Sequence, residues 1–488
     1  MKILFFAKGQ ESISIEYLSA ALKRAGHEVE LAFDPGLDDI LGFLDLGLFK
    51  LRGNAWFVKT ISRFQPDLIC FSCLTNLYSF VKETAAEIKK HFPIPIAVGG
   101  IHPTILPEQT IANPDIDMIC IGEGDDALVE LADKMQKGVD YTGTRNFWFK
   151  KNGTVIRNPI RPLIQDLDRL AFPDRDLFYR NGCFAGTFYF VSGRGCPFTC
   201  SYCCHHYLQN LYRGKGSYVR RRSVENIIRE IRESMQRYTI TSVYSMDDLF
   251  TLDDDWIEAF SILYSRQVNL PLYCHIRPGT VTPRMIESLK RANCTSVFFG
   301  VDSGSEDMRF TIMNRKIPNR VILEQAALLR KSGIRITTSG IFGLPDETDR
   351  QMFATLDLIK KIKSDFAYSF IFYPFPNTDS YRYCLEHGLI DPEAHEKIIS
   401  GEGSFHKTSL IRHKHAELAE ILKNLLPFAV RFPFLAPLVN LLIEKGGIRM
   451  SRLVFTLTVP VTYSSYGRNK MREILSVARK NWRVLVGH

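Results

Sequence analysis

Residues 192–204 read SGRGCPFTCSYCC, and three of their cysteines, Cys196, Cys200 and Cys203, have the spacing CxxxCxxC. Iron–sulfur clusters are held by cysteine thiolates, because iron takes soft, deprotonated ligands. Three cysteines leave the fourth iron of a four-iron cluster without a protein ligand, so a small molecule can chelate it. The spacing therefore predicts a 4Fe-4S cluster with one open iron.

A zinc site is the alternative interpretation of the same cysteines. Structural zinc has four ligands, and Cys204, His205 and His206 follow directly and could supply the fourth. The spacing by itself leaves both metals open, because Cys and His clusters bind either. The pattern downstream of the cysteines favours the cluster.

Apolar strand-like runs alternate with helical patterns from residue 187 onwards. Six such β/α units predict a partial (β/α)6 barrel of the TIM type over residues 186–390. In barrels of this kind the active residues stand at the carboxyl ends of the strands. The strands are expected at 187–191, 241–246, 271–276, 296–301, 335–341 and 366–372, with helices at 223–237, 253–267, 282–292, 319–332 and 348–363.

The predicted strands end in residues that can bind a charged or nucleotide-like ligand. Carboxylates accept hydrogen bonds from ammonium groups, Arg pairs with carboxylates, and Gly lets a flat group approach the backbone. A pair of acidic residues alone is more often a helix N-cap, but several such features in order favour a site. They are Asp247 and Asp248, Arg277, Asp302 and Ser303, and Gly340 and Gly343.

Residues 1–140 have a second β/α pattern, which predicts a doubly wound parallel sheet of the Rossmann or flavodoxin type. Such sheets bind ligands at the carboxyl ends of their strands. No GxGxxG follows the first strand, which disfavours a dinucleotide. Strands are expected at 2–7, 29–33, 67–72, 95–98 and 117–121, helices at 16–25, 80–91 and 126–137, and ligand contacts at Ser72, Thr75, Gly99, Gly100, Gly122, Glu123 and Gly124.

The CxxxCxxC spacing, with the aromatic Tyr202 before the last cysteine, resembles the signature of the radical SAM superfamily. The resemblance implies that the open iron binds S-adenosylmethionine, which an electron then cleaves to a 5′-deoxyadenosyl radical. It also implies the roles of the strand-end residues. Asp247 or Asp248 would accept from the ammonium group, Arg277 would pair with a carboxylate, Asp302 and Ser303 would bind the ribose or carboxylate, and Gly340, Gly343 and Tyr202 would contact the adenine.

Residues 99–104 (GGIHPT) and 121–124 (IGEG) resemble the cobalamin-binding domain that is fused to many radical SAM enzymes. The resemblance implies cobalamin at the carboxyl edge of the N-terminal sheet. The Asp-x-His-x-x-Gly motif that ligates cobalt in another cobalamin family does not occur in the sequence. His102 is therefore expected to line the site through its backbone, and no histidine is expected on cobalt.

In the cobalamin-fused family the usual reaction is methylation of an unactivated carbon, or of phosphorus. Ring formation and oxidative rearrangement with the same cofactors are the alternatives. A radical methylthiotransferase acting on RNA would need a second cluster, and Cys70, Cys73 and Cys120 lie in strand-like runs with a spacing unlike a ligand loop. A cobalamin carrier without enzymatic activity would not need CxxxCxxC. The family also implies an external electron donor such as flavodoxin or ferredoxin.

The 488 residues predict two or three domains, and the formal charge of +9 fits an anionic substrate, a membrane surface or nucleic acid. The basic residues are spread along the chain, which makes nucleic acid an unlikely partner. The eleven cysteines show no disulfide framework, residues 1–7 resemble a strand rather than a signal peptide, and no run reaches about 20 apolar residues. A cytoplasmic protein is expected.

Residues 141–185 are expected to form a linker with a hairpin at 151–153, and residues 391–488 a mostly helical region that shapes the substrate pocket. Apolar runs at 428–442 and 453–459 precede a basic end. Such runs can lie on membranes, but core helices are the favoured interpretation, since the runs are short. A small, hydrophobic or lipid-like substrate and transient membrane contact follow as hypotheses. The basic end comprises Arg468, Lys470, Arg472, Arg479, Lys480 and Arg483.

Overall fold

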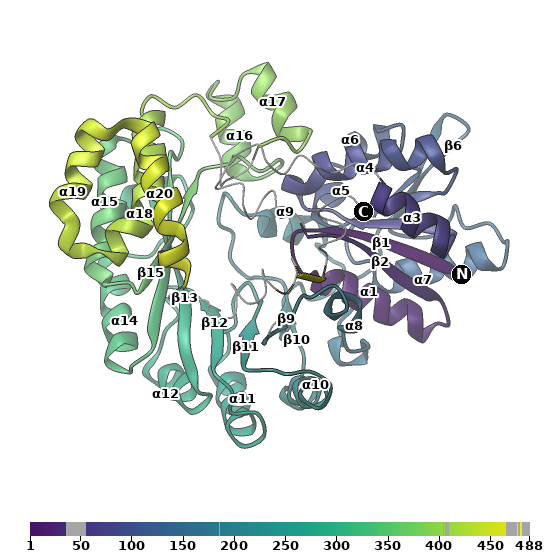
Figure 1. Ribbon diagram of the computed structural model, residues 1–488, viewed down its shortest axis with the longest axis horizontal. Helices are drawn as coiled ribbons and strands as arrows, with labels where there is room; N and C mark the ends of the chain where they lie inside the picture. Colours follow the sequence, from purple (N-terminus) through teal and green to yellow (C-terminus); the bar gives the residue numbers. More distant parts are fainter. Residues whose placement is uncertain are drawn as a thin grey trace.

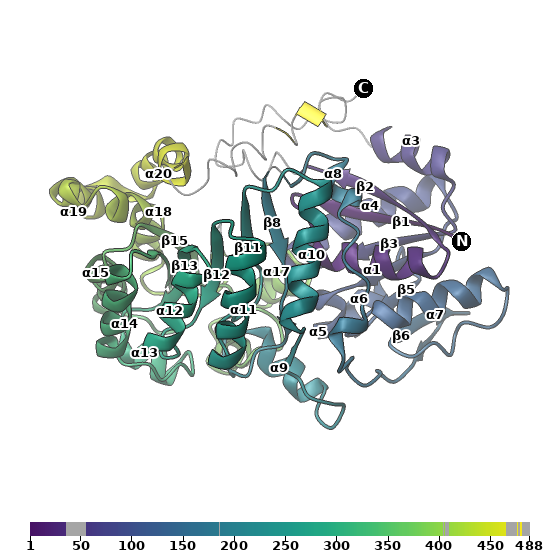
Figure 2. The same ribbon diagram turned by 90° about the horizontal axis from the view of Figure 1, so that it is seen from below.

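The computed structural model describes residues 1–35, 55–184, 186–403, 405, 409–464, 476, 479 and 480. Figures 1 and 2 show two helix-covered sheets side by side, the N-terminal one in purple and blue and the second in teal and green. Helices α18 (Ala416–Arg431), α19 (Ala436–Leu441) and α20 (Gly447–Ser464) lie at the far end of the second sheet, away from the N-terminal one. Most of the basic end, Arg468, Lys470, Arg472 and Arg483, lies outside the described residues.

The N-terminal sheet has the strand order β2-β1-β3-β4-β5-β6-β7. Strands β1 to β5 pair in parallel, which confirms the predicted doubly wound sheet. Its central strands β1, β3 and β4 are apolar except at their ends, because helices cover both faces of a parallel sheet. The bounds are β1 (Lys2–Lys8), β2 (Glu28–Asp34), β3 (Leu68–Ser72), β4 (Ile96–Gly99), β5 (Met118–Cys120), β6 (Phe147–Lys151) and β7 (Thr154–Arg157).

Helices α1 (Ile13–Arg24) and α7 (Asp125–Gln136) cover one face of this sheet, and α3 (Ala55–Phe64) and α4 (Tyr78–His91) cover the other. Helix α1 begins three residues earlier than predicted, because the Ser12 hydroxyl caps it by accepting from the Ile15 N–H. Three short helical turns connect the strand ends. They are η1 (Thr75–Leu77), α5 (Ile101–Ile105) and α6 (Pro107–Ala112).

The predicted hairpin at 151–153 forms, but it belongs to the N-terminal sheet. Strand β6 pairs antiparallel with β5, and β7 pairs antiparallel with β6. Asn152 and Gly153 both have positive φ, 51° and 76°, as a two-residue hairpin turn requires. The sheet therefore continues past residue 140, into the segment that the sequence analysis assigns to the linker. Short helical turns η2 (Leu167–Arg169) and α8 (Asp176–Tyr179) follow.

The second sheet has the order β15-β14-β13-β12-β11-β8, and all of its neighbouring strands are parallel. This is the predicted open barrel of six β/α units. Its strands are β8 (Thr187–Phe190), β11 (Ser242–Ser245), β12 (Leu272–Ile276), β13 (Cys294–Asp302), β14 (Arg335–Phe342) and β15 (Phe366–Ile371). Its helices are α10 (Val224–Arg237), α11 (Asp254–Gln267), α12 (Pro283–Arg291), α13 (Glu306–Thr311), α14 (Asn319–Lys331) and α15 (Asp349–Ile362).

A short ribbon, β9 (Gly193–Arg194) with β10 (Arg220–Arg221), and helix α9 (Cys204–Leu211) lie between the first two barrel strands. Helix α18 packs against β14 and β15 and so covers the edge of the barrel sheet. No helix among the described residues is long and apolar enough to cross a membrane. The C-terminal elements are α16 (Asp379–Glu386), α17 (Pro392–Ile399), α18 (Ala416–Arg431), η3 (Pro433–Leu435), α19 (Ala436–Leu441), η4 (Leu442–Gly446) and α20 (Gly447–Ser464).

A buried group of charges joins the two halves of the chain. The Arg175 guanidinium, just before α8, donates to Glu16 at 2.6 Å, Glu230 at 2.9 Å and Glu11 at 3.1 Å. Glu16 lies in α1 and Glu230 in α10, and these side chains are at most 4% exposed. Buried charges need paired partners, so this contact fixes how the linker meets both sheets.

Candidate active site and cofactor cavity

A cavity of about 290 Å³ lies between the N-terminal sheet and helices α1 and α7, and it reaches the carboxyl ends of the strands. Small side chains, Cys70, Ala97 and Cys120, line its inner part on the sheet. Because the cavity opens at the sheet edge, a ligand larger than the cavity can insert one arm and leave the rest outside. Six of the predicted cobalamin contacts line it: Ser72, Gly99, Gly100, Gly122, Glu123 and Gly124.

Gly100 shows why the edge of the cavity needs glycine. It has φ of +100°, and a Cβ there would stand 2.7 Å from the Cys73 carbonyl oxygen. At Gly122, φ is +79° and a Cβ would overlap the Tyr212 hydroxyl. Both positions combine a left-handed backbone with a close approach, which only glycine tolerates.

Thr75 and His102, also predicted to contact cobalamin, are buried beside the cavity and do not line it. The His102 ring stacks on Tyr78 with 3.9 Å between ring centroids, and neither ring nitrogen has a hydrogen-bond partner among the described residues. Burial lowers the pKa of His102 to about 3, so the ring is neutral. This ring is directed into the protein and is not placed to reach a cobalt ion in the cavity.

The cysteine loop begins at the carboxyl end of β8 and is held there by Asp247. One carboxylate oxygen of Asp247 accepts the Ser192 and Gly193 N–H groups, both at 2.8 Å, and the other accepts from the Ser245 hydroxyl. Burial raises the pKa of this carboxyl group. Asp247 is thus already bound to the protein backbone, which leaves Asp248 as the acidic residue of the pair that faces outward.

The three cysteines of the motif follow on one loop, with Cys200 buried and Cys196 and Cys203 half-buried. Arg277 donates to the Cys200 Sγ at 3.3 Å and lies over the Phe198 ring at 3.8 Å. Burial raises the pKa of the Cys196 thiol to about 11. Three unbridged thiols on a loop beside a guanidinium donor fit the ligand set of an iron–sulfur cluster, whose sulfurs accept hydrogen bonds.

Asp302 and Tyr202, both predicted to contact S-adenosylmethionine, meet in one network. The Tyr202 hydroxyl and the Ser339 hydroxyl each donate to the Asp302 carboxylate at 2.7 Å, and Arg315 forms an ion pair with it. Asp302 has φ of +67° at the end of β13. The network fixes the Tyr202 ring against the end of the barrel sheet, next to Cys203.

The other predicted contacts divide into buried and outward-facing groups. Ser303 is fully buried, and its hydroxyl accepts from the Ser305 N–H at 3.2 Å. Asp248 is about half exposed, and His205 contacts it at 2.9 Å beside the cysteines. Asp248 therefore keeps its predicted access to a ligand, whereas the Ser303 side chain does not.

Gly340 and Gly343 have different surroundings from those expected. A Cβ at Gly340 would meet the side chains of Leu426 at 3.0 Å and Ile359 at 3.2 Å, so this glycine lets α15 and α18 approach the sheet. The Gly343 N–H donates to Glu347 at 2.8 Å, and burial raises the pKa of Glu347 to about 8. The space at Gly340 faces helices rather than the carboxyl edge where adenine is expected.

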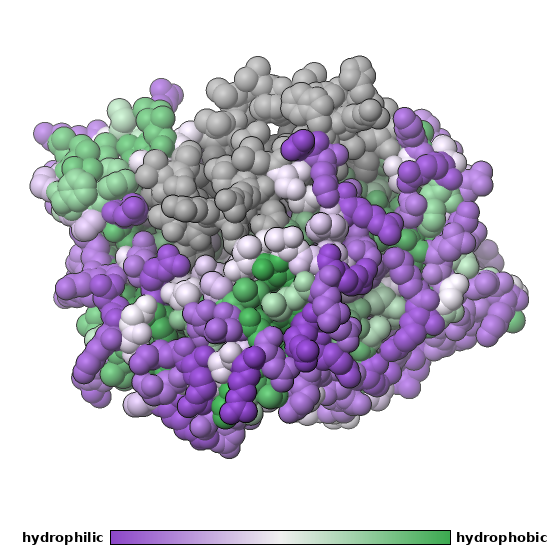
Figure 3. Space-filling model, turned by 60° about the horizontal axis from the view of Figure 1, so that its bottom comes forward, coloured by the Kyte–Doolittle hydropathy of each residue, from purple (hydrophilic) through white to green (hydrophobic). Residues whose placement is uncertain are grey.

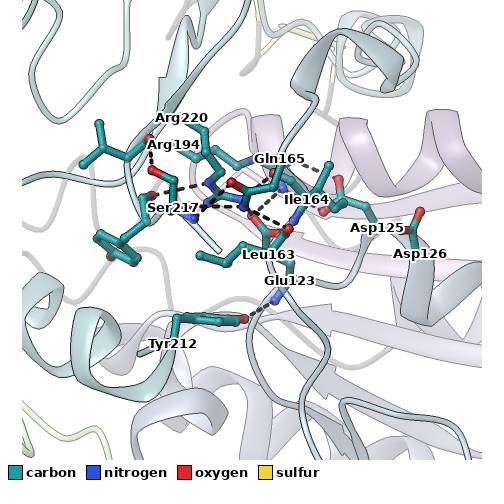
Figure 4. A network of polar contacts seen from close by, with 12 residues as sticks. Glu123, Asp125, Asp126, Leu163, Ile164, Gln165, Arg194, Tyr212, Ser217 and Arg220 are labelled. Carbon is teal, nitrogen blue, oxygen red and sulfur yellow. Dashed lines mark hydrogen bonds and ion pairs between the residues drawn. The ribbon is translucent and has the colours of Figure 1, made fainter. Parts of the chain in front are cut away.

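Arg194 connects the cysteine loop to the cavity (Figure 4). Its guanidinium donates to both oxygens of Asp125, at 2.8 and 2.9 Å, and to Glu123 at 3.1 Å. Arg220 reaches the same Glu123 oxygen at 2.8 Å, and the other oxygen accepts the Ile164 N–H. Arg194, Glu123 and Asp125 all line the cavity, so the two sites share one ionic contact two residues before Cys196.

Sequence reasoning missed Arg194, Arg315, Glu347 and Tyr212. Arg194 stands between two glycines and is the one charged residue of the stretch 192–204, which was the available signal. The Tyr212 hydroxyl accepts the Glu123 N–H at 3.0 Å. The sequence contains no signal for this contact, because it joins residues 89 positions apart.

Comparison with known proteins identifies two domains in the chain. Residues 190–359 match the model of the radical SAM superfamily, and residues 9–132 match the B12 binding domain. The matched regions contain the cysteine loop and most of the residues that line the cavity, respectively. They thus coincide with the two resemblances derived from sequence.

Two relatives and one solved structure extend this agreement over most of the chain. An uncharacterized methyltransferase of Pyrococcus horikoshii is 29% identical over 78% of this chain and 79% of its own length. Cytidylyl-2-hydroxyethylphosphonate methyltransferase of Streptomyces wedmorensis is 23% identical, with the same shares covered. The structure of the cobalamin-dependent S-adenosylmethionine radical enzyme OxsB superposes with a TM-score of 0.67 at 15% identity, covering 100% of this chain and 79% of that one.

These matches also establish the cofactors, which are S-adenosylmethionine, a 4Fe-4S cluster and cobalamin. The free cysteines on the barrel loop and the glycine-edged cavity are consistent with them. The chain belongs to the radical SAM superfamily, as an enzyme that carries a cobalamin-binding domain before its radical SAM domain.

Proposed function

We propose that this enzyme is a cobalamin-dependent methyltransferase that acts on an unactivated carbon, or on phosphorus, of a small hydrophobic molecule. The observation that carries the proposal is Arg194, which lines the cavity and also leads into the cysteine loop. Two cofactors can cooperate in one transfer only if their sites are close and fixed relative to each other. The ion pairs of Arg194 with Asp125 and Glu123 supply that fixed relation.

When bound, the cofactors supply a methyl group and a radical that can remove hydrogen from an unreactive carbon. Cys196, Cys200 and Cys203 would hold the cluster, and Arg277 would donate to the Cys200 sulfur. Asp248, exposed beside the cysteines, would accept from the ammonium group of S-adenosylmethionine. Asp247 and the Asp302 network would keep the loop and Tyr202 in place, and neither carboxylate needs to contact the ligand.

Methyl transfer is favoured over ring closure because both relatives described above are named methyltransferases. A hydrophobic substrate is favoured by exposed apolar side chains at both sheet edges. Leu74, after β3, is 51% exposed, and Met246, after β11, is 44% exposed. We also propose an external one-electron donor such as flavodoxin or ferredoxin, because an electron is needed to cleave S-adenosylmethionine.

The reaction is tested with reconstituted full-length enzyme, cobalamin, a chemical reductant and S-adenosylmethionine carrying a deuterated methyl group. Extract of the source cells supplies the substrate, and mass spectrometry searches for products that contain the deuterated methyl. A labelled product together with 5′-deoxyadenosine supports the proposal. New products without the label would instead indicate ring closure or rearrangement.

The cobalamin site is tested separately by filling the cavity. Ala97→Leu places a larger side chain on its inner wall, so we expect the variant to lose hydroxocobalamin binding while its iron content is unchanged. His102→Leu serves as the matched control, because the ring is buried and does not line the cavity. Equal cobalamin binding by Ala97→Leu and the wild type would place the cofactor elsewhere.

A further inference from the structure

The C-terminal helices expose a concentration of large apolar side chains. Of the fifteen large apolar residues exposed in the described part of the chain, six lie between residues 434 and 457. Phe434 is 75% exposed and Leu457 66%, and Figure 3 shows an apolar area at its upper left, where α18–α20 lie in Figure 1. Single exposed apolar residues are ordinary, but a contiguous group marks an interaction surface. The six are Phe434, Leu438, Leu441, Met450, Leu453 and Leu457.

Five of these residues lie on α19 and α20, and Phe434 lies in η3, which packs against α19. On α20, Met450, Leu453 and Leu457 are spaced by three and four residues, which places them on one face. The opposite face of α20 is inward, since Ser451 and Phe455 are buried. On α19, Leu438 and Leu441 are three residues apart, and η4 packs against both helices. The six residues therefore form one surface, here called the apolar face.

Basic residues surround the apolar face. Residues 431–458 contain four basic residues and one acidic residue, Glu444. Arg431, Lys445 and Arg449 are exposed, and none of them has an ion-pair partner among the described residues. Only Arg452 is paired, with Glu420 at 2.5 Å. Exposed apolar side chains with unpaired cations beside them are complementary to a partner that has an apolar interior and an anionic surface.

We propose that the apolar face is a membrane-docking surface that binds the headgroup region of an anionic bilayer. Short helices with apolar residues on one side and Lys or Arg beside them lie in the plane of the interface. Anionic lipids contribute about 1 kcal/mol per basic residue near the surface. Helix α19 has six residues, begins with Ala436-Pro437 and follows Pro433 of η3, and no described helix is a candidate membrane span, so we expect the region to lie on the bilayer surface. The proposal does not depend on the reaction that the enzyme catalyses.

Flotation of the full-length protein with lipid vesicles tests the proposal. We expect the protein to float with vesicles of phosphatidylcholine and phosphatidylglycerol at low salt, and to float less with phosphatidylcholine alone or at high salt, because salt screens exposed charges. Failure to float with the anionic vesicles at low salt would overturn the proposal.

Matched variants locate the surface. Leu453→Glu with Leu457→Glu, and separately Lys445→Glu with Arg449→Glu, should each weaken vesicle binding by at least about tenfold. Leu328→Glu, at a site 40% exposed on α14, is the control and should bind as the wild type does. Circular dichroism and 5′-deoxyadenosine formation should be unchanged in all variants, because these residues lie outside the two cofactor sites.

A second copy of the chain is the competing occupant. Light scattering of the wild type without lipid measures its mass directly. A monomer that binds anionic vesicles supports the proposal. A dimer that dissociates in Leu453→Glu with Leu457→Glu would overturn it, since the apolar face would then be covered by another copy.

Discussion

The carboxyl edges of the two parallel sheets are built by opposite means. At the N-terminal sheet, glycine and small side chains leave a cavity open between the sheet and its helices. At the barrel, the buried carboxylates Asp247, Asp302 and Glu347 accept hydrogen bonds from the loops that follow the strands. At the N-terminal sheet, small residues leave room for a large ligand. At the barrel, buried acidic side chains hold the loops of the active site in place by hydrogen bonds.

Replacing a cysteine of the motif should have the largest effect on the site at the barrel edge. We expect Cys196→Ala, Cys200→Ala and Cys203→Ala each to reduce iron content and 5′-deoxyadenosine formation to background, because three thiolates are the whole protein ligand set. Anaerobic iron analysis and chromatography of the nucleoside measure both. Cys204→Ala, one residue beyond the motif, is the control and should keep its iron. If Cys204→Ala lost its iron and Cys203→Ala kept it, Cys204 rather than Cys203 would be the third ligand.

Removing Arg194 should break the contact between the two edges. Arg194→Met leaves the Asp125 carboxylate buried without its partner, which costs about 3–5 kcal/mol of unfolding free energy. Denaturant unfolding measures the loss. Arg169→Met is the matched control, because Arg169 and Asp126 form an exposed pair worth at most about 1 kcal/mol. Equal losses in both variants would mean that Arg194 is only a surface cation.

Crowding the open edge should have an intermediate effect. Gly100→Ala adds a Cβ 2.7 Å from the Cys73 carbonyl oxygen at a φ of +100°, so we expect a loss of about 2–3 kcal/mol and weaker cobalamin binding. In Gly138→Ala, φ is +65° and no atom lies within 4 Å, so only the conformational cost of about 1 kcal/mol remains. Unfolding and cobalamin titration of the two variants separate crowding from backbone strain, and equal losses would exclude crowding.

The pH dependence of stability concerns the barrel edge alone. Burial raises the pKa of Glu347 from its ordinary value of 4.5 to about 8. The folded state therefore holds a proton that the unfolded state releases, and its stabilising contribution is complete below pH 4.5 and is lost as pH rises through 8. The melting temperature of Glu347→Gln should change less with pH between pH 5 and 8.5 than that of the wild type. An unchanged slope in that variant would assign the pH dependence to another group.

Much of the fold was predictable because it depends on local patterns. The alternation of apolar strands and helices gave both parallel sheets, and the turn at Asn152-Gly153 gave the hairpin. The pairing of that hairpin with β5 was not predictable. An edge strand can pair with any strand that has free backbone N–H and C=O groups, so the sequence does not specify the partner. The basic tail was predicted from charge alone and lies mostly outside the described residues.

The parts of the candidate site that could be predicted are those whose residue type indicates a single role. Glycine at a cavity edge and cysteine in a short loop both fall into this group. Acidic residues do not, because Asp247 and Asp248 are adjacent and chemically alike, yet one binds backbone amides and the other faces outward. The expectation that the His102 ring stays off cobalt came from the absence of a motif, and its position in a loop gave no sign that the ring stacks on Tyr78.

The Arg175 contact has a consequence for how this enzyme can be divided. Its guanidinium pairs with Glu16 in one sheet unit and Glu230 in the other, 159 and 55 residues away along the chain. A fragment that ends at residue 140 would keep Glu11 and Glu16 and lose the cation that pairs with both, so two neighbouring carboxylates would repel each other without compensation. We therefore expect the two cofactor-binding units to unfold together in one cooperative transition rather than as independent modules.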